Sequence, residues 1–383
     1  MRFSLAEPAS YFERQKARAK NVTAPWAATE TVLGDRDFHE EKHPYRSEFE
    51  RDRDRIVHSK AFRRLEYKTQ VFVNHLGDNF RTRLTHSIEV SGIARSVGRA
   101  LGLNEDLIES IALAHDLGHP PFGHAGEKAL HESLRGKGSF DHNEQSLRVV
   151  TSLENRYPYF KGLNLTRATR LGLQKHNSLP QGMSHTLEAQ IVDLCDEIAY
   201  SNHDVDDGIE SGFLSLEEIN EVQLWHRHWQ KIQSEFQNTS RKVQVRYCIR
   251  NMINSMTFDL IQTTKSNLES AKISNLTQVL NYHNTAQNTH MLASFSVEMK
   301  ENVVELKRFL FRKLYRHTEV QKMNQNAADV ISFLFQYFEK SPQKLPENFQ
   351  PRLNQMGLYM TLTDFIAGMT DRYALSLYHQ LKA

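Results

Sequence analysis

Hydrophobic residues recur at intervals of three and four along most of this chain, while glycine, proline and β-branched runs are sparse within those stretches. The clearest example is Val90, Ile93, Val97 and Leu101, which predicts an amphipathic helix from about Thr85 to Leu101. His86 lies four residues before Val90, so it shares the buried face of this helix. The pattern as a whole favours an all-α protein.

Breaks in this pattern divide the remainder of the chain. Gly102 ends the first helix, and Asn104 is suited to cap the next one, whose inward face leads from Ile108 and Ile111 to His115. The other predicted elements are helices over Ser47–Gln70 and Glu188–Asp204, a turn at Asn74–Phe80, a loop over residues 136–145 leading into Ser146–Leu153, and about seven helices from Ser215 onward, with breaks near Ser274, Asn281–Thr289 and Ser341–Pro351. We expect an N-terminal arm, irregular and helical, over residues 1–60, a core over 61–215, and a C-terminal helical region over 216–383 that packs on the core.

Composition narrows the class of protein. The 383 residues are 39% hydrophobic and 25% charged, which allows a large buried core. No apolar run reaches the roughly 18 residues that a membrane helix needs, so we expect no membrane partner. The two cysteines form neither a disulfide framework nor a Cys-x-x-Cys metal site, which favours a reducing, cytoplasmic setting. The net charge is only +2, but bases cluster between Lys307 and Arg316, where an exposed helix face and a phosphate-binding lining are about equally favoured interpretations.

Histidine and aspartate residues gather on apolar helix faces in three places. His86 precedes one apolar stripe, His115 and Asp116 end another, and Asp196 lies on the helix predicted over Glu188–Asp204. A single buried histidine is usually an ordinary core residue. Burying two carboxylates as well requires a counter-charge, because an unpaired buried polar group costs a few kcal/mol. The four residues therefore predict a divalent metal site, and a ligand set without thiolates favours Mg²⁺, Mn²⁺ or Fe over structural Zn²⁺.

The same residues resemble a known family. His86, the His115-Asp116 pair and Asp196 follow the pattern of the HD superfamily of metal-dependent phosphohydrolases. The chain also resembles, more closely, the bacterial deoxyguanosine-triphosphatase-like dNTP triphosphohydrolases. That likeness is carried by Phe62–Leu65, Lys68–Val71, Gly77-Asp78, Arg81–Ser87, the HDLGHPPFGHAGE run that starts at His115, and Asp364–Ala374. It implies an HD-domain helical fold over residues 61–215 and an enzyme that converts a dNTP (dGTP or others) and water to a deoxynucleoside and inorganic triphosphate.

The resemblance also implies roles for individual residues. The metal ligands would be His86, His115, Asp116 and Asp196, and one divalent ion would occupy each site. His124 and Glu127 would form a catalytic pair, assisted by His119 facing phosphate and by His142. Substrate would be held by Arg83 at the phosphates and by Gln70, Tyr200 and Asp204 at the deoxyribose. Residue 197 is a glutamate, where the animal dNTPases have a lysine that meets the terminal phosphate, so we expect the bases between Lys307 and Arg316 to hold that phosphate.

Two other functions stay open from the sequence alone. One is a different HD phosphohydrolase, either a 5′-nucleotidase or a phosphodiesterase. The other is a nucleotide-sensing or single-stranded-DNA-binding protein with a vestigial site, against which the complete set of ligands argues. The resemblance further implies a homo-oligomer, with a hexamer favoured, and allows dNTP effectors and a single-stranded DNA effector.

Overall fold

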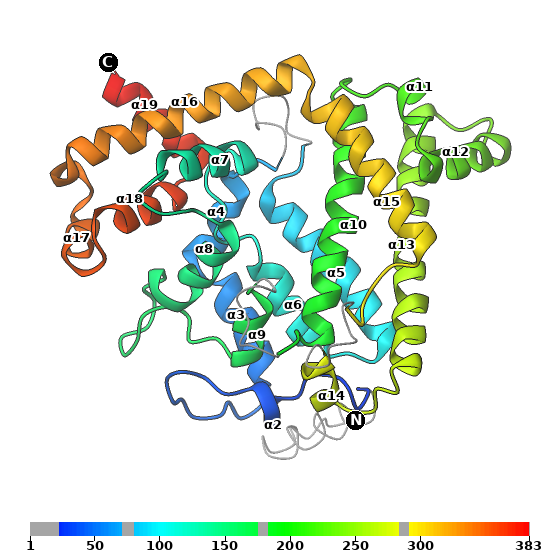
Figure 1. Ribbon diagram of the computed structural model, residues 1–383, viewed down its shortest axis with the longest axis horizontal. Helices are drawn as coiled ribbons and strands as arrows, with labels where there is room; N and C mark the ends of the chain where they lie inside the picture. Colours follow the sequence, from blue (N-terminus) through cyan, green and yellow to red (C-terminus); the bar gives the residue numbers. More distant parts are fainter. Residues whose placement is uncertain (1–22, 71–79, 175–182, 283–290, 383) are drawn as a thin grey trace, which may run out of the picture.

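The computed structural model describes residues 23–70, 80–174, 183–282 and 291–382, and within these ranges the chain forms helices and no β-strand (Figure 1). The predicted all-α fold is therefore confirmed. The predicted turn at Asn74–Phe80 except Phe80 itself, residues 77 and 78 of the family motif, and most of the predicted break at Asn281–Thr289 lie outside the described residues. The helices of the first half are α2 (Glu30–Leu33), α3 (Glu48–Val57), α4 (Lys60–Arg64), α5 (Arg83–Leu101), α6 (Glu105–Ala114), α7 (Gly123–Ser133), α8 (His142–Arg148), α9 (Arg167–Gly172) and α10 (Leu187–Glu210).

The main core lies where α5, α6 and α10 pack against one another and against later helices. Figure 1 shows α5 and α10 side by side at the centre of the molecule, with α13 along one edge. Val90 of α5, Ile108 of α6 and Ile191 of α10 are fully buried in this core. The helices that complete this half are α11 (Leu216–Ile219), α12 (Gln223–Glu235), α13 (Arg241–Ser270), α14 (Leu276–Leu280) and α15 (Val297–Leu310).

A second core forms around α7, which packs against the long helix α16. Leu130 of α7 is buried there with Ile331, Leu362 and Ala374. In Figure 1, α16 crosses above α7, and α18 lies below α16. The remaining helices are α16 (Thr318–Lys340), α17 (Gln350–Met356), α18 (Leu358–Ala367) and α19 (Asp371–Lys382). The C-terminal region therefore contributes to both cores: α12, α13 and α15 join the first, and α16, α18 and α19 join the second.

The predicted helix ends around α5 and α6 agree with the structure. Gly102 follows α5 with a positive φ of 69°, a conformation that glycine adopts without strain, and it ends the helix. Asn104 caps α6, because its side chain accepts a hydrogen bond from the backbone of Leu107. α5 begins two residues before the predicted Thr85, since Thr82 and Thr85 form a capping box there.

Three predicted elements were wrong. Ser47–Gln70 is not one helix: α3 ends at Val57, and Ser59 caps a separate short helix, α4, which a 3₁₀ turn follows over Leu65–Tyr67. Residues 136–145 are not loop throughout, because the Asp141 side chain caps α8 at His142. The described residues after Ser215 contain nine α-helices rather than about seven, since breaks near the end of the chain separate α17, α18 and α19.

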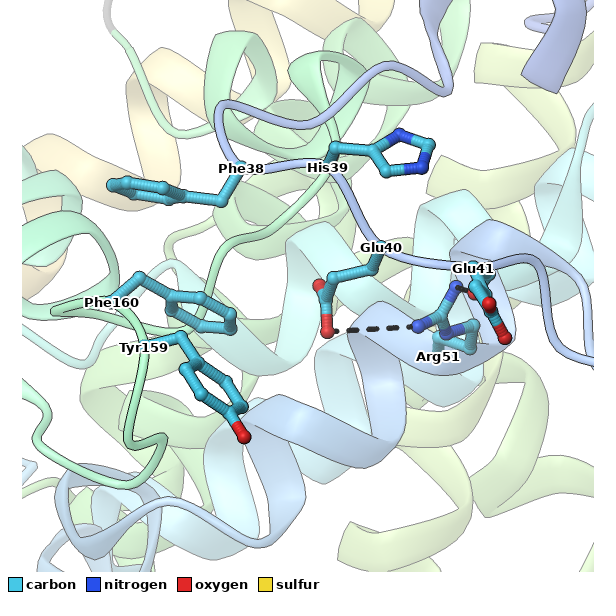
Figure 2. A pocket seen from close by; sticks show the side chains of 7 residues that line it. All are labelled: Phe38, His39, Glu40, Glu41, Arg51, Tyr159 and Phe160. Carbon is cyan, nitrogen blue, oxygen red and sulfur yellow. Dashed lines mark hydrogen bonds and ion pairs between the residues drawn. The ribbon is translucent and has the colours of Figure 1, made fainter.

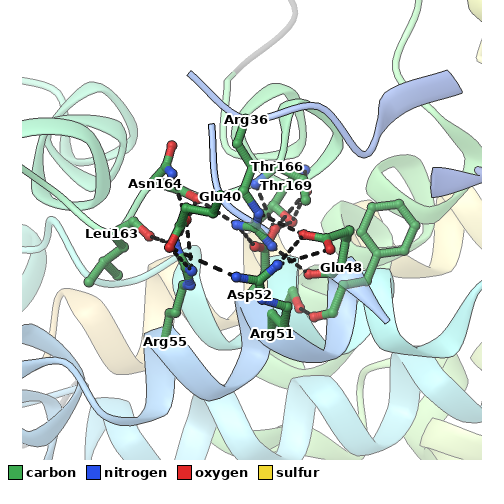
Figure 3. A network of polar contacts seen from close by, with 12 residues as sticks. Arg36, Glu40, Glu48, Arg51, Asp52, Arg55, Leu163, Asn164, Thr166 and Thr169 are labelled. Atoms are coloured by element: carbon green, nitrogen blue, oxygen red, sulfur yellow. Dashed lines mark hydrogen bonds and ion pairs between the residues drawn. The ribbon is translucent and has the colours of Figure 1, made fainter. Parts of the chain in front are cut away.

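A buried polar network fastens the N-terminal arm to the core (Figure 3). Asp52 on α3 accepts hydrogen bonds from the backbone amide and the hydroxyl of Thr166, at 2.8 and 2.6 Å, and from the hydroxyl of Thr169 at 2.7 Å. Arg36, in the segment before α3, pairs with the second oxygen of Asp52 at 2.7 Å. These bonds compensate the buried carboxylate, so the arm is held at the N-terminal end of α9. Among the described residues, no helix has both the length and the apolar content needed to span a bilayer.

Candidate active site

Four side chains from three helices meet at one end of the main core. His86 lies on α5, Asp196 lies on α10, and His115 and Asp116 directly follow α6. The His86 Nε2 atom is 2.9 Å from Asp196 Oδ1. His115 Nε2 is 3.4 Å from Asp116 Oδ1 and 3.6 Å from Asp196 Oδ1. The structure therefore brings together the four residues that the sequence singled out. In the chain, His86 and Asp196 are 110 positions apart.

The bonds of His115 determine what its ring presents to the carboxylates. Its Nδ1 lies 2.6 Å from the backbone oxygen of Ala112, so Nδ1 carries the proton and donates it. Its Nε2 is buried and has no hydrogen-bond partner among the described residues, yet it faces two carboxylates. Burial lowers the pKa of this imidazole, but Asp116 and Asp196 outweigh burial and raise the pKa to about 9. The position between these three side chains therefore favours a cation.

A chain of hydrogen bonds behind His86 leads to the same conclusion. His86 Nδ1 lies 3.3 Å from Nδ1 of His203, and the His203 Nε2 atom pairs with the carboxylate of Glu89. Burial lowers the pKa of His203, so the ring is neutral and donates its single proton to Glu89. His203 Nδ1 must then accept the Nδ1 proton of His86. In a neutral His86 the Nε2 lone pair then lies 2.9 Å from an Asp196 carboxylate oxygen, and a cation bound by both atoms would relieve the contact between these two acceptors. The residues present thus fit a divalent metal.

Asp116 connects this cluster to a second group of histidines. Its Oδ1 lies 2.9 Å from Nδ1 of His119, and its Oδ2 accepts a bond of 3.0 Å from Arg83. Arg83 was expected to contact phosphate, and here one of its nitrogens binds the carboxylate of a predicted metal ligand. Its Nε and Nη2 atoms are buried without a partner in the described part of the chain, so two donors remain for a ligand. A side chain at Gly123 would approach Nη2 to 2.9 Å, which explains why glycine stands there.

The second group gathers around the Glu127 carboxylate. His142 Nδ1 lies 2.7 Å from Glu127 Oε1, and the His142 backbone amide donates to the same oxygen at 3.1 Å. His124 Nδ1 lies 3.4 Å from the other oxygen, and its side chain is 75% exposed. The rings of His119 and His142 lie with centroids 3.8 Å apart and are tilted by 31°. Glu127 therefore orients two histidines and holds His142 more tightly than His124. Burial raises the pKa of Glu127, but the hydrogen bonds from His124 and His142 lower it far below its ordinary value.

The residues expected at the deoxyribose lie farther along α10. Tyr200 and Asp204 are one turn apart, and Asp204 is buried. The hydroxyl of Tyr315, which sequence analysis did not identify, donates to Asp204. Burial raises the pKa of Asp204 to about 8. Gln70 lies next to the start of α7, where its backbone oxygen would be 3.2 Å from a side chain at Gly123, and its side-chain Oε1 is buried without a partner in the described residues. A tyrosine within a basic stretch was the only sequence signal for Tyr315.

The basic stretch at the end of α15 divides between two environments. Lys307 forms an ion pair with Glu197, and its ammonium lies 5.9 Å from the centre of the Tyr200 ring. Arg312 and Lys313 instead pair with acids at and beyond the end of α11. The acids that neutralise these bases lie about 90 to 110 positions earlier in the chain, so sequence spacing alone could not reveal them. Lys307 is the member of this stretch beside the candidate site.

A separate hollow of about 500 Å³ lies between the N-terminal arm and the segment before α9 (Figure 2). Its lining residues are Phe38, His39, Glu40, Glu41, Arg51, Tyr159 and Phe160. Figure 2 shows the Glu40 and Arg51 side chains paired within it, at 3.8 Å. None of the residues described above lines this hollow, so it is distinct from the candidate active site.

Comparison with known proteins agrees with this geometry. The family model of the HD domain matches residues 83–201, and the model of the phosphohydrolase-associated domain matches residues 293–380. A deoxyguanosinetriphosphate triphosphohydrolase-like protein of Leptospira interrogans is 43% identical over 382 residues, which cover 97% of this chain and 100% of the relative. The chain belongs to the deoxyguanosinetriphosphate triphosphohydrolase-like family. Another member, from Thiobacillus denitrificans, is 46% identical over 373 residues, 94% of this chain and 97% of the relative.

Most of the candidate site residues fall in the HD match, and a few fall in the phosphohydrolase-associated match. The HD match contains the four residues around His115 and all four residues of the Glu127 group. Tyr315 and Lys307 fall within the phosphohydrolase-associated match. His203 and Asp204 follow the HD match by two and three residues, on the same helix α10. The candidate site therefore includes residues from both matched regions.

Proposed function

We propose that this protein is a metal-dependent hydrolase that converts a dNTP and water to a deoxynucleoside and inorganic triphosphate. The observation that carries the proposal is that two groups of side chains lie next to each other. The group around His115 favours a cation, the group around Glu127 contains histidines held by a carboxylate, and the 2.9 Å contact between Asp116 and His119 joins them. A phosphate ester that bridges the two groups would have a cation on one side and a proton donor on the other. The printed names of the relatives support deoxyguanosine triphosphate or a related dNTP as substrate.

The metal would be held by His86, His115, Asp116 and Asp196. Nitrogen and carboxylate ligands without thiolates support Mg²⁺, Mn²⁺ or Fe as the ion. When bound, such an ion neutralises charge that grows on the α-phosphate and lowers the pKa of an adjacent water.

The Glu127 group would supply the proton transfer at the bond between the α-phosphorus and the 5′-oxygen of the sugar. The exposed ring of His124 can reach a substrate, and the Glu127 carboxylate, 3.4 Å from its Nδ1, orients the ring. A protonated His124 would donate to the 5′-oxygen of the sugar as that oxygen leaves the α-phosphorus. His119, which lies between Asp116 and the ring of His142, would contact the α-phosphate. His142 would hold Glu127 in place and so keep the carboxylate aimed at His124.

The remaining side chains would bind the two ends of the nucleotide. Asp204 and Gln70 would bind the 3′-hydroxyl, and Tyr200 would pack on the sugar. Arg83 would direct its two unpaired donors toward the phosphates, since a forked guanidinium suits their oxygens. We assign the terminal phosphate to Lys307, because it is the base of its stretch that lies beside Tyr200.

The experiment that tests this function is product analysis for each dNTP, alone and in pairs, with Mg²⁺, Mn²⁺ and Fe²⁺. Inorganic triphosphate and deoxynucleoside are the expected products of the wild-type protein. His124→Ala and Asp196→Ala should abolish or greatly reduce their formation. His131→Ala, which removes a histidine from the same helix α7 two turns away, is the matched control and should leave hydrolysis unchanged.

Two results would contradict the proposal. Release of orthophosphate or pyrophosphate in place of triphosphate would indicate a different HD phosphohydrolase. Unchanged hydrolysis in both His124→Ala and Asp196→Ala would remove the assignment of this site.

Three broader features belong to the same proposal. The arm over residues 1–60, the HD core over 61–215 and the C-terminal region over 216–383 are supported by the two family matches, which fall within the second and third segments. A cytoplasmic location is supported by two buried, unpaired cysteines. A homo-oligomer, dNTP effectors and a single-stranded DNA effector rest on the family resemblance, and analytical ultracentrifugation with and without dNTPs or oligonucleotide tests them.

A further inference from the structure

One part of the sequence pattern has no place in the chemistry proposed above: the segment Asp364–Ala374, at the junction of α18 and α19. It contains two buried aspartates, Asp364 and Asp371, in the phosphohydrolase-associated part of the chain. Both direct their carboxylates away from their own helices and toward elements that carry the histidines of the Glu127 group. The contacts of Asp371 are the more informative.

Asp371 bonds to two active-site segments at once. Its Oδ1 accepts the backbone amide proton of Phe122 at 2.9 Å, and its Oδ2 accepts the backbone amide proton of Thr69 at 2.9 Å. The Thr69 hydroxyl also donates to Oδ2. Phe122 directly precedes α7, the helix that carries His124 and Glu127. Thr69 directly precedes Gln70.

The bond to Phe122 restrains a backbone that has an unfavourable conformation. Phe122 has a φ of 65°, which is uncommon and strained for a residue with a side chain. Such a conformation persists only where its surroundings impose it. Gly123 follows at a φ of 57° and lies against Gln70 and Arg83, so the two segments are packed without spare room. The direction in which α7 leaves this turn therefore depends on the groups that hold Phe122.

Two neighbouring contacts join the same elements. The buried Lys68 ammonium donates to the backbone oxygens of His119 and of Ala367, the last residue of α18. Asp364 binds Arg148 at 2.6 Å and Gln145 at 3.0 Å, both on α8, the helix that begins at His142. The junction of α18 and α19 is thus bonded to the turn that carries His119, to the start of α7 and to α8.

We infer that Asp371 is a positioning residue, which sets the placement of His124 and Glu127 relative to Gln70 by holding the Phe122 and Thr69 amides on one carboxylate. Asp364 does the same for His142 through α8. The C-terminal region therefore completes the active site without contacting substrate through either aspartate. This inference rests on the proposed function for its kinetic test, and on the Phe122 amide for a test that does not require activity.

The test compares Asp371→Asn and Asp371→Ala with a matched control, Asp52→Asn. Asp52 is also a buried aspartate that accepts a threonine amide and hydroxyl, but its partners belong to the arm network and none of them contacts the active site. Asp371→Asn replaces one acceptor with an NH₂ group that opposes an N–H donor, so we expect kcat to fall about tenfold. Asp371→Ala frees both amides, and we expect a fall of about 100-fold, since displacement by about 1 Å can have that effect. Asp52→Asn should reduce thermal stability but keep kcat within about twofold, because it shares no partner with the site.

A double-mutant comparison separates positioning from general destabilisation. If Asp371 acts through His124, adding Asp371→Asn to His124→Ala should reduce kcat no further. Equal losses of kcat in Asp371→Asn and Asp52→Asn at temperatures well below both unfolding midpoints would overturn the inference. An undiminished effect of Asp371→Asn in the His124→Ala background would also overturn it.

Hydrogen exchange followed by mass spectrometry provides the test that is independent of activity. A peptide spanning residues 119–127 should exchange at least about tenfold faster in Asp371→Ala than in wild type, since the Phe122 amide loses its acceptor. In Asp52→Asn its exchange should be unchanged. Unchanged exchange in Asp371→Ala would overturn the inference even if no dNTP were hydrolysed. Absence of wild-type dNTP hydrolysis, by contrast, would contradict the proposed function and leave the exchange result to decide the role of Asp371.

Discussion

Replacing His203 with alanine should weaken metal binding although His203 is not a predicted ligand. The His203 ring stands between Glu89 and the metal-facing residue His86, with Nδ1 atoms of the two histidines 3.3 Å apart. This arrangement fixes the proton of His86 on Nδ1 and leaves its Nε2 free to bind a cation. His203→Ala removes that restraint without changing any of the four proposed ligands.

The size of the effect follows from the surroundings of His86. The side chain is buried, so its Nδ1–H would lose its acceptor where water does not replace it easily. An unsatisfied buried donor costs about 1–3 kcal/mol, and partners of this kind typically affect metal affinity by about 10- to 100-fold. The 3.3 Å bond is long, which favours the lower end of that range. We therefore expect the Kd for Mn²⁺ to rise about tenfold in His203→Ala, and less in His203→Gln, whose amide oxygen can still accept a proton.

The assay is titration of metal-free protein with Mn²⁺ in the absence of nucleotide, with free Mn²⁺ followed by electron paramagnetic resonance. Asp196→Ala should abolish tight binding and provides the lower reference. His226→Ala, which removes a half-buried histidine of α12 that bonds to Asn220, should bind Mn²⁺ as wild type does. An unchanged Kd in His203→Ala, with the Asp196→Ala effect present, would refute the hydrogen-bond chain as a determinant of His86.

Three further predictions concern the substrate end of the site. Lys307→Met should raise the KM for a dNTP by about threefold to tenfold with little change in kcat, because a partly exposed charge contributes modestly to binding. Equal KM values for the variant and wild type would exclude Lys307 from phosphate binding. Arg83→Lys should lower kcat/KM by about 10- to 100-fold, since lysine keeps the charge but lacks the forked guanidinium that can bind both Asp116 and a ligand. A change under twofold in steady-state kinetics would contradict this prediction. Burial raises the pKa of Asp204 from 3.8 to about 8, so its protonated form contributes stability that is fully present below about pH 4 and is lost as the pH rises through 8. The difference in Tm between wild type and Asp204→Asn should therefore shift against wild type over that interval in thermal scans, and a constant difference would refute the raised pKa.

The helices nearest the metal cluster were predictable because their signals are local. The apolar stripe of α5, the glycine that ends it and the asparagine that caps α6 act within one or two helical turns. The division of residues 47–70 was missed because Ser59 caps a helix only five residues long, too short to show a period of its own. The start of α8 was missed because the glycines that precede Asp141 indicated a loop, although the Asp141 side chain caps the helix.

The helical class, the family resemblance and the identities of the residues that form the two groups could all be read from the sequence. Residue type and spacing along one helix carry that information, since a histidine four positions before an apolar residue must share its face. The connections between the groups became visible in the folded chain: His203 bonds to His86, Tyr315 donates to Asp204, and Asp371 holds the start of α7. These three bonds join residues that are 117, 111 and 249 positions apart in the chain. Helix packing, rather than helical periodicity, sets which of them meet.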